Sequence, residues 1–456
     1  MAGVRHARSN IDVRIFMPLK AILLLTAILC LIELPSTLWA QEAVSAATGS
    51  ATGSSSSAET ESSASGTSSP ATGVTGSAGN GPLIEAPSSA GVFWRTPVRI
   101  DATVSAGYDD NVNTTNSPKE ASSFTNGNVL LDYTFTDPRL QLILNGGAGA
   151  TYYYEHINGQ DYDIDLKGAL DLTYRSSPRL TLGSTLLVEF LTEPSFGYAG
   201  GLNSRNGNYL YTTDEFFVTS VWSSHLSTKT SYAFNAYNYD NDAVATFSNS
   251  VTNTLGNEFR YLLVPTTTLV AEYRYSIVSY PDGSLDSTTH FALGGIDHVF
   301  NPRFSGSFRG GAEFRSYDND GDQTGPYFEG TLTYAVGKTT SFSWNNRYGL
   351  EEPDLPTQQS RTTFRSGLQT KLKLTTRIAS AIDLYYVHDD YHSLPNSPVP
   401  SAPFKENTFD AGISFRYTFT TLFGIQIGYH YTDVSSDVAA REYSRNRVYG
   451  GANVTF

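Results

Sequence analysis

The chain ends on the stretch Arg447-Val448-Tyr449-Gly450-Gly451-Ala452-Asn453-Val454-Thr455-Phe456. Every second residue, counted back from Phe456, is apolar or small, and most of the residues between them are polar. This alternation is typical of a β-strand with one apolar face and one polar face. A transmembrane β-barrel needs such a strand at its end, because its last strand must close against its first and its apolar face must meet lipid.

The same period of two recurs along the chain. Residues 98–109, 162–175, 304–315 and 409–419 each alternate apolar and polar side chains. These runs of about a dozen residues are longer than the strands of about 5–6 residues that are usual in soluble proteins. They are long enough for tilted strands that cross a membrane.

The predicted strands are joined by short turns and long polar loops in alternation. Short polar residues before proline favour tight turns, because proline fixes φ and the polar side chain can bond the backbone. The short turns are Asp137-Pro138-Arg139, Ser177-Pro178-Arg179, Val264-Pro265-Thr266, Asn301-Pro302-Arg303, and others near 223–228, 337–338, 375–376 and 420–421. The long loops lie near 110–121, 156–160, 192–209, 240–248, 280–286, 318–324, 351–359, 391–404 and 435–443.

These connections predict an all-β fold, a transmembrane antiparallel up-and-down β-barrel of about 18 strands (16–18). Short turns on one side and long loops on the other are the outer-membrane arrangement, with the short turns in the periplasm and the long loops outside the cell. An even number of strands places both ends of the barrel in the periplasm.

The first 94 residues do not fit the barrel pattern. Basic residues precede the apolar run 21–32, and small residues allow cleavage after Ala40, so we expect a signal peptide over 1–40. Residues 41–94, rich in Ser, Ala, Gly and Thr, are expected to form a disordered periplasmic linker that precedes a barrel over 95–456. The one cysteine, Cys30, follows Leu29 rather than a small residue, so lipidation is not expected.

The composition agrees with a barrel and excludes other classes. The sequence has 39 Gly, 29 Tyr and 25 Phe but only 16% charged residues, as expected where apolar and polar faces alternate. A net charge of -14 argues against a nucleic-acid partner. A large soluble β-sandwich or β-propeller is the alternative that composition leaves open.

Two motifs carry a family resemblance. Gly451, Val454 and Phe456 resemble the C-terminal assembly signal of bacterial outer-membrane proteins. Together with the first-strand motif Gly107-Tyr108-Asp109-Asp110-Asn111, they make the chain resemble the outer-membrane β-barrel porin family of Gram-negative bacteria, in its porin-2-like branch. The resemblance implies export through the general secretory route, outer-membrane lipid and lipopolysaccharide as surroundings, and the barrel assembly machinery as a partner. Some such barrels are associated with exopolysaccharide export.

Charged residues on the polar face of the predicted strands are candidates to line a pore. An unpaired charge in a dry interior is costly, so these charges predict water inside the barrel. Ion-pair ladders between neighbouring strands are the alternative interpretation of the same charges. The candidates are Arg99, Asp101, Asp163, Asp165, Lys167, Asp171, Arg260, Glu272, Arg274, Arg309, Glu313, Arg315, Arg365 and Arg416.

The loop 192–209 is a candidate constriction. It lies between the fifth and sixth predicted strands, where the third long loop of general porins folds into the barrel and narrows the pore. Its candidate residues are Glu193, Phe196, Tyr198 and Arg205. An ordinary surface loop is the alternative.

The sequence therefore predicts a channel for passive diffusion of small hydrophilic solutes. The alternative is the barrel of a secretion or exopolysaccharide export system, in which the linker contacts a periplasmic partner. We expect no enzyme activity, cofactor or metal site, because no Ser/His/Asp spacing and no metal-spaced histidine set is present. Asp318, Asp320, Asp322 and Glu329 have calcium-loop spacing, but Gln323 stands where that loop needs glycine. The solute, the ion selectivity and the association of several barrels stay open.

Overall fold

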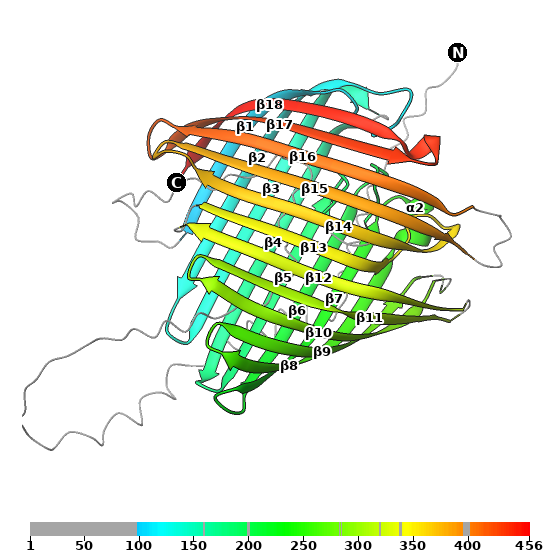
Figure 1. Ribbon diagram of the computed structural model, residues 1–456. Helices are drawn as coiled ribbons and strands as arrows, with labels where there is room; N and C mark the ends of the chain where they lie inside the picture. The colour runs from blue at the N-terminus through cyan, green and yellow to red at the C-terminus, as the bar shows by residue number, and fades with distance from the viewer. Residues whose placement is uncertain are drawn as a thin grey trace, which may run out of the picture. The chain divides into compact units, whose positions relative to one another are not determined.

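The computed structural model describes residues 98–157, 160–197, 201–281, 283, 285–318, 321–336, 340–394 and 402–456 (Figure 1). The predicted signal peptide 1–40 and linker 41–94 lie outside these residues, as does Tyr198. Within the described ranges, no helix is long and apolar enough to cross a membrane.

The described residues form an 18-stranded sheet in which each strand pairs antiparallel with the next. β18 also pairs with β1, so the sheet closes into a barrel, as the sequence predicts. The strands are β1 (Val98–Asp109), β2 (Ser122–Thr136), β3 (Leu140–Ile157), β4 (Gln160–Ser177), β5 (Leu180–Leu191), β6 (Tyr209–Val221), β7 (Leu226–Tyr239), β8 (Ser250–Val264), β9 (Thr267–Ser279), β10 (Ser287–Asn301), β11 (Phe304–Tyr317), β12 (Asp322–Val336), β13 (Thr340–Glu351), β14 (Gln358–Lys373), β15 (Ile378–Ser393), β16 (Phe404–Thr418), β17 (Phe423–Ser436) and β18 (Tyr443–Thr455). Two short helices, α2 (Asp242–Ser248) and η2 (Ala439–Arg441), lie in the connections.

The two faces of the barrel wall follow the predicted alternation. In β1, Asp101 and Thr103 are buried at 3% and 5% exposure, whereas Val104 and Tyr108 are 63% and 49% exposed. Polar side chains therefore point into the barrel and apolar ones point outward. This is the inverse of a soluble protein and the arrangement of a barrel whose outer surface meets lipid.

The short turns of the described residues lie at one end of the barrel, the end where the C-terminus lies in Figure 1, here called the turn end. They occur where the sequence predicts them, and the predicted turn 337–338 lies outside the described residues. The residue before proline caps the turn as expected, because the backbone N–H of Arg303 donates to Asn301 Oδ1 (2.9 Å) and that of Arg139 to Asp137 Oδ1 (3.2 Å). The opposite end, with the longer connections, is here called the loop end.

Some predicted loops are shorter than expected. Pairing between β3 and β4 continues to Ile157 and Gln160, so the predicted loop 156–160 is mostly strand. β12 begins at Asp322 rather than after residue 324, and β6 begins at Tyr209, which leaves 192–208 as the β5–β6 loop. The polar segment 240–248 contains α2, whose N-cap Asn241 accepts a hydrogen bond from the backbone N–H of Ala243.

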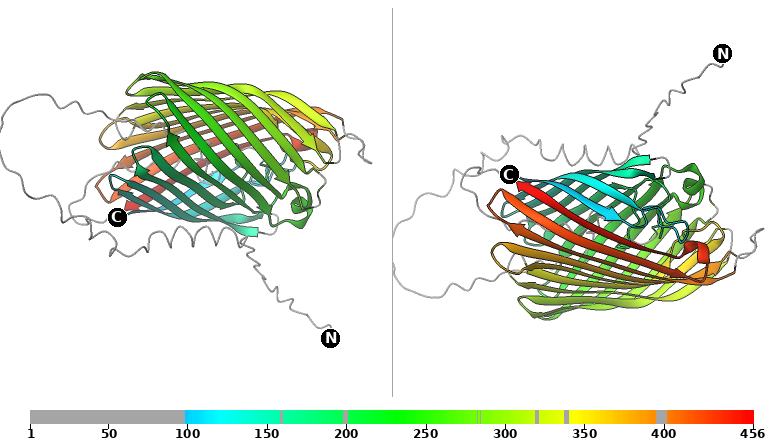
Figure 2. Two further views of the ribbon diagram at one scale, coloured as in Figure 1. Left: turned by 90° about the horizontal axis from the view of Figure 1, so that it is seen from below. Right: turned by 90° about the horizontal axis from the view of Figure 1, so that it is seen from above.

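The seam between β1 and β18 closes the wall (Figure 2). The backbone N–H of Phe456 donates to Ile100 O (2.8 Å), and the N–H of Ile100 donates to Phe456 O (3.1 Å). Gly451 lies on the inner face of this seam, where an added Cβ would lie 2.5 Å from Val104 O. The seam therefore requires glycine at position 451.

Replacing Gly451 with alanine should weaken barrel closure by about 1–3 kcal/mol, the usual cost of overpacking. Gly450→Ala is the matched control, because a Cβ there meets no atom closer than 3.9 Å. The urea concentration at which each variant unfolds can be measured from its gel mobility, because an unheated folded barrel and an unfolded chain migrate differently. Equal midpoints for the two variants would contradict this role of the seam.

Candidate functional site

The β5–β6 loop, residues 192–208, crosses the interior of the barrel. It leaves the wall beside β4 and β6, and Thr192 Oγ1 donates to Asn208 Oδ1 (2.6 Å) to hold its two ends together. From there its residues bond to side chains on β14, β15, β16 and β18, which are not neighbours of β5 in the sheet. A loop on the outer surface could not make these contacts.

The middle of the loop is held by two arginines of β14. Arg365 Nη1 donates to the backbone oxygen of Phe196 (2.5 Å), and Arg361 Nη2 donates to that of Gly201 (3.1 Å). Arg365 also pairs with Glu351 on β13 (2.9 Å). Because both bonds are to backbone oxygens, they fix the path of the loop whatever side chains it carries.

Asn203 anchors the loop farther along the wall. Its Nδ2 donates to Glu406 Oε1 on β16 (2.5 Å) and to Asp389 Oδ2 on β15 (3.3 Å). Tyr443 on β18 donates to the backbone oxygen of Asn203 (2.8 Å). All four side chains are buried, so these bonds lie away from solvent.

Glu193 joins the loop to the seam. Its two carboxylate oxygens accept from Arg445 on β18, and the same guanidinium donates to both oxygens of Asp109 on β1. Burial alone would raise the pKa of Glu193, but the adjacent Arg445 and Arg205 hold it at about 2. Glu193 is therefore charged at every physiological pH.

Arg205 ties the returning part of the loop to β4. Its Nη2 pairs with Asp163 Oδ1 (2.6 Å), and its guanidinium lies 5.6 Å from the ring centre of Tyr153. Its backbone N–H donates to Thr114 Oγ1 in the β1–β2 connection (2.8 Å). Of the predicted constriction residues, Glu193 and Arg205 thus hold the loop by ion pairs, while Phe196 holds it through its backbone.

Other loop-end connections also fold inward. Arg441 in η2 pairs with Asp354 (2.7 Å) and Glu406 (2.8 Å). Val244 of α2 packs with Leu202 of the crossing loop in one buried apolar cluster. The loop end is therefore narrowed by several connections that bond to each other and to the wall.

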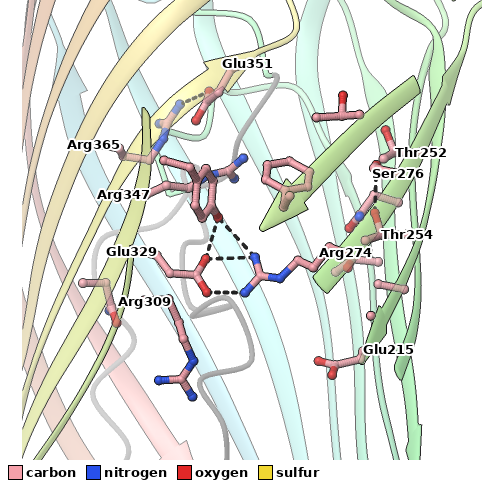
Figure 3. Close-up of a pocket in the computed structure, with 18 of the residues that line it drawn as sticks. Glu215, Thr252, Thr254, Arg274, Ser276, Arg309, Glu329, Arg347, Glu351 and Arg365 are labelled. Carbon is pink, nitrogen blue, oxygen red and sulfur yellow. Dashed lines mark hydrogen bonds and ion pairs between the residues drawn. The ribbon is translucent and has the colours of Figure 1, made fainter. Parts of the chain in front are cut away.

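A cavity of about 390 Å³ remains beside the crossing loop. Its walls come from β6 to β15, and Gly197 of the loop lines it from the other side. Figure 3 shows Arg274 of β9 facing Glu329 of β12, and the two pair at 2.5 Å. The guanidinium of Arg347 lies 5.7 Å from the ring centre of Tyr327 and interacts with the charges of Glu351 and Glu329.

Five of the predicted pore-lining residues line this cavity: Glu272, Arg274, Arg309, Arg315 and Arg365. Glu313 does not, because it is fully buried and accepts from the backbone N–H of Leu350 (2.6 Å). The remaining candidates lie outside the lining of this cavity: Arg99, Asp101, Asp163, Asp165, Lys167, Asp171, Arg260 and Arg416.

Many of these charges form ion pairs with neighbouring strands. Lys167 pairs with Glu189 (2.7 Å), and Arg309 with Asp297 (2.8 Å). Charges that line the cavity are paired as well, since Arg274 pairs with Glu329 and Arg365 with Glu351, so the same side chains form ion pairs and face the cavity.

Sequence reasoning missed several residues that build the site. Arg347 and Glu329 line the cavity, and Arg361, Asn203 and Glu406 hold the loop. Four of these residues point inward in the alternation of their strands: Arg361, Arg347, Glu329 and Glu406. Selecting every inward-facing charged residue from the sequence pattern would therefore have found them. Asn203 carried no sequence signal, because its role depends on contacts with strands about 200 residues away.

None of the curated proteins matches the chain. Solved structures with similarity include a BenF-like porin from Pseudomonas fluorescens Pf-5 (10% identity, 78% of this chain and 98% of the other, TM-score 0.41). They also include OccK3 (OpdO) of Pseudomonas aeruginosa (12% identity, 79% and 96%, TM-score 0.40). Because both TM-scores are below 0.5, we draw no conclusion about this chain from these two structures.

The family described as "Putative beta-barrel porin 2" matches residues 90–456, which is most of the chain. The match includes all 18 strands, the seam and the crossing loop. The chain therefore belongs to this family of porin-like β-barrel channels of the Gram-negative outer membrane.

Proposed function

We propose that the protein is a passive diffusion channel for small hydrophilic solutes, and that residues 192–208 form its constriction. The observation that carries the proposal is the loop itself, which bonds to strands on distant parts of the wall. A barrel of this strand number encloses room for water, and a loop that crosses it limits the size of what can pass.

The solute path in this proposal follows the β6–β15 side of the barrel. There the cavity of about 390 Å³ is lined by charged, hydroxyl and amide side chains together with aromatic and apolar ones such as Phe291 and Val278. Such a lining suits hydrated solutes, because charged groups such as the Arg274–Glu329 pair are costly without water or partners. The cavity volume lies in the range of small-molecule sites.

The export alternative finds less support. An extended polysaccharide would need a continuous passage at the loop end, where α2 packs against the β5–β6 loop and η2 is paired with Asp354 and with Glu406 of the wall. Each of these contacts would have to open for the polymer to pass. The linker 41–94, which that alternative connects to a periplasmic partner, lies outside the described residues.

Purified full-length protein in planar lipid bilayers should show discrete single-channel conductance. Replacing residues 194–206 with a short Gly-Ser segment should raise that conductance about twofold or more, since the constriction is removed from a barrel wide enough for water. The same replacement at the turn 222–225, whose Trp222 is exposed, is the control and should leave conductance unchanged. Folded wild-type protein that conducts no ions would contradict the proposal.

Weakening the Glu193 anchor should make the constriction fluctuate. Glu193→Gln leaves Arg445 paired with Asp109 but removes the charge that holds the loop to it, so current noise and brief openings should increase. Glu155→Gln is the control, because that exposed carboxylate accepts from Ser122 and from the backbone N–H of Ser123 at the start of β2, away from the crossing loop. Indistinguishable recordings from the two variants would show that the anchor does not hold the loop.

The same anchor predicts a pH dependence with a definite sign. The pKa of Glu193 is lowered from 4.5 to about 2, so its contribution is complete above about pH 4.5 and is lost as pH falls toward 2. Wild-type current noise should therefore stay constant from pH 7 to pH 5 and rise below about pH 4. Glu193→Gln should be noisy throughout, and a wild-type transition near neutral pH would contradict this assignment.

A further inference from the structure

Asp214 on β6 breaks the alternation that governs the barrel wall. Its neighbours Thr213 and Glu215 line the interior cavity, so Asp214 points outward. Phe216, two residues along the same face, is 45% exposed on the outer surface. Ser184 on β5, which shares that face, donates from Oγ to Asp214 Oδ1 (3.2 Å).

The height of Asp214 on the wall separates it from the other outward charges. Asp322, Asp390, Lys405 and Asp433 each lie within four residues of the loop end of their strands, where the wall leaves the membrane. Asp214 lies seven residues from Val221, at the middle of β6. In the described strands it is the one outward-facing Asp, Glu, Lys or Arg at mid-strand.

A charged residue is costly on a lipid face at this depth, and such residues usually mark a functional contact. Ser184 supplies only one long hydrogen bond to the carboxylate. Asp214 Oδ2 accepts no hydrogen bond within the described residues. The outer face around Asp214 is therefore poorly suited to lipid and suited to a protein surface that offers a donor.

A donor lies on the same patch. Asn257 on β8 also faces outward, and its Nδ2 donates one N–H to Thr230 Oγ1 on β7 (2.8 Å), which leaves the second N–H of the amide available. Asn257 lies seven residues from Val264, the turn end of β8, so it stands at the same height as Asp214. Tyr232 of β7, 45% exposed, lies between them.

We propose that the outer face of β5–β8 is a contact surface for a second copy of the chain. A twofold axis along the membrane normal, close to Tyr232, places Asp214 of each barrel opposite Asn257 of the other. The patch is complementary to itself, because the acceptor Asp214 and the donor Asn257 stand at equal height on either side of β7. A twofold contact therefore forms the Asp214–Asn257 pair twice. No other partner needs to supply the missing donor.

The first test is the mass of full-length protein extracted from outer membranes in mild detergent, by light scattering corrected for detergent. Two barrels per particle are expected for the wild type. Asp214→Leu and Asn257→Leu should each lower the dimer fraction at least tenfold at equal concentration. Ser366→Leu on β14 is the matched control, because Ser366 also faces outward seven residues from the turn end of its strand.

Heat-dependent gel mobility verifies that each variant is folded, and cysteine cross-linking gives a second measurement that does not depend on removing the contact. Mixed Asp214→Cys and Asn257→Cys proteins should form a disulfide-linked dimer under mild oxidation, whereas Asp214→Cys alone should not. Wild-type monomers, a dimer unaffected by both leucine variants, or cross-linking of Asp214→Cys to itself would overturn the proposal. Co-purification of a different protein on this face would also overturn it.

Discussion

One guanidinium, that of Arg445, lies between the two features on which this barrel depends. It donates to Asp109 on β1 and thereby reinforces the seam that closes the wall. It also binds Glu193 and thereby fixes the start of the crossing loop. Removing one partner of such a buried pair typically costs about 3–5 kcal/mol, because the remaining charge is left without compensation. Closure of the wall and placement of the loop are consequently coupled through one side chain.

Other charged side chains in the interior are paired in the same way. Buried and half-buried arginines on β14, β18 and η2 each bond to a carboxylate or to a backbone oxygen of the crossing loop. Charges that serve the architecture are thus satisfied by the protein itself. Arg347 differs, since it lines the cavity beside the ring of Tyr327 instead of bonding to the crossing loop.

Local patterns determined how much of the fold could be predicted. Strands and turns follow from a period of two and from residues such as Asn301 before proline, because these signals act within a few positions. Strand ends at the loop end were less predictable, since pairing continued through polar residues such as Asp322 that also suit a loop. The seven-residue helix α2 has no apolar period long enough to detect.

The candidate site was predictable only in part. Glu193 and Arg205 could be chosen because their loop was long and well placed, and inward parity identified Arg274 and Arg365. The partners of the loop could not be chosen, because Asn203 and Glu406 meet only after the barrel closes. Parity also says nothing about which inward charges pair with each other, since that depends on the register and height of neighbouring strands. Asp214 is a charged residue on the apolar, outward face of its strand. This exception could be recognised only after the structure had shown which face of β6 points outward.

The most direct test of the central claim is whether the β5–β6 loop touches the far wall in the native membrane. Asn203 Nδ2 lies 2.5 Å from Glu406 Oε1, so cysteines at both positions, whose side chains are shorter, should be joined by a short bifunctional thiol reagent in intact outer membranes and change the gel mobility of the unfolded protein. Cysteines at Glu406 and the exposed Asn206 serve as the control and should remain unlinked. Efficient linkage of Asn203→Cys to Glu406→Cys is the predicted result. Failure of that pair to link in folded barrels would contradict a loop that crosses the lumen.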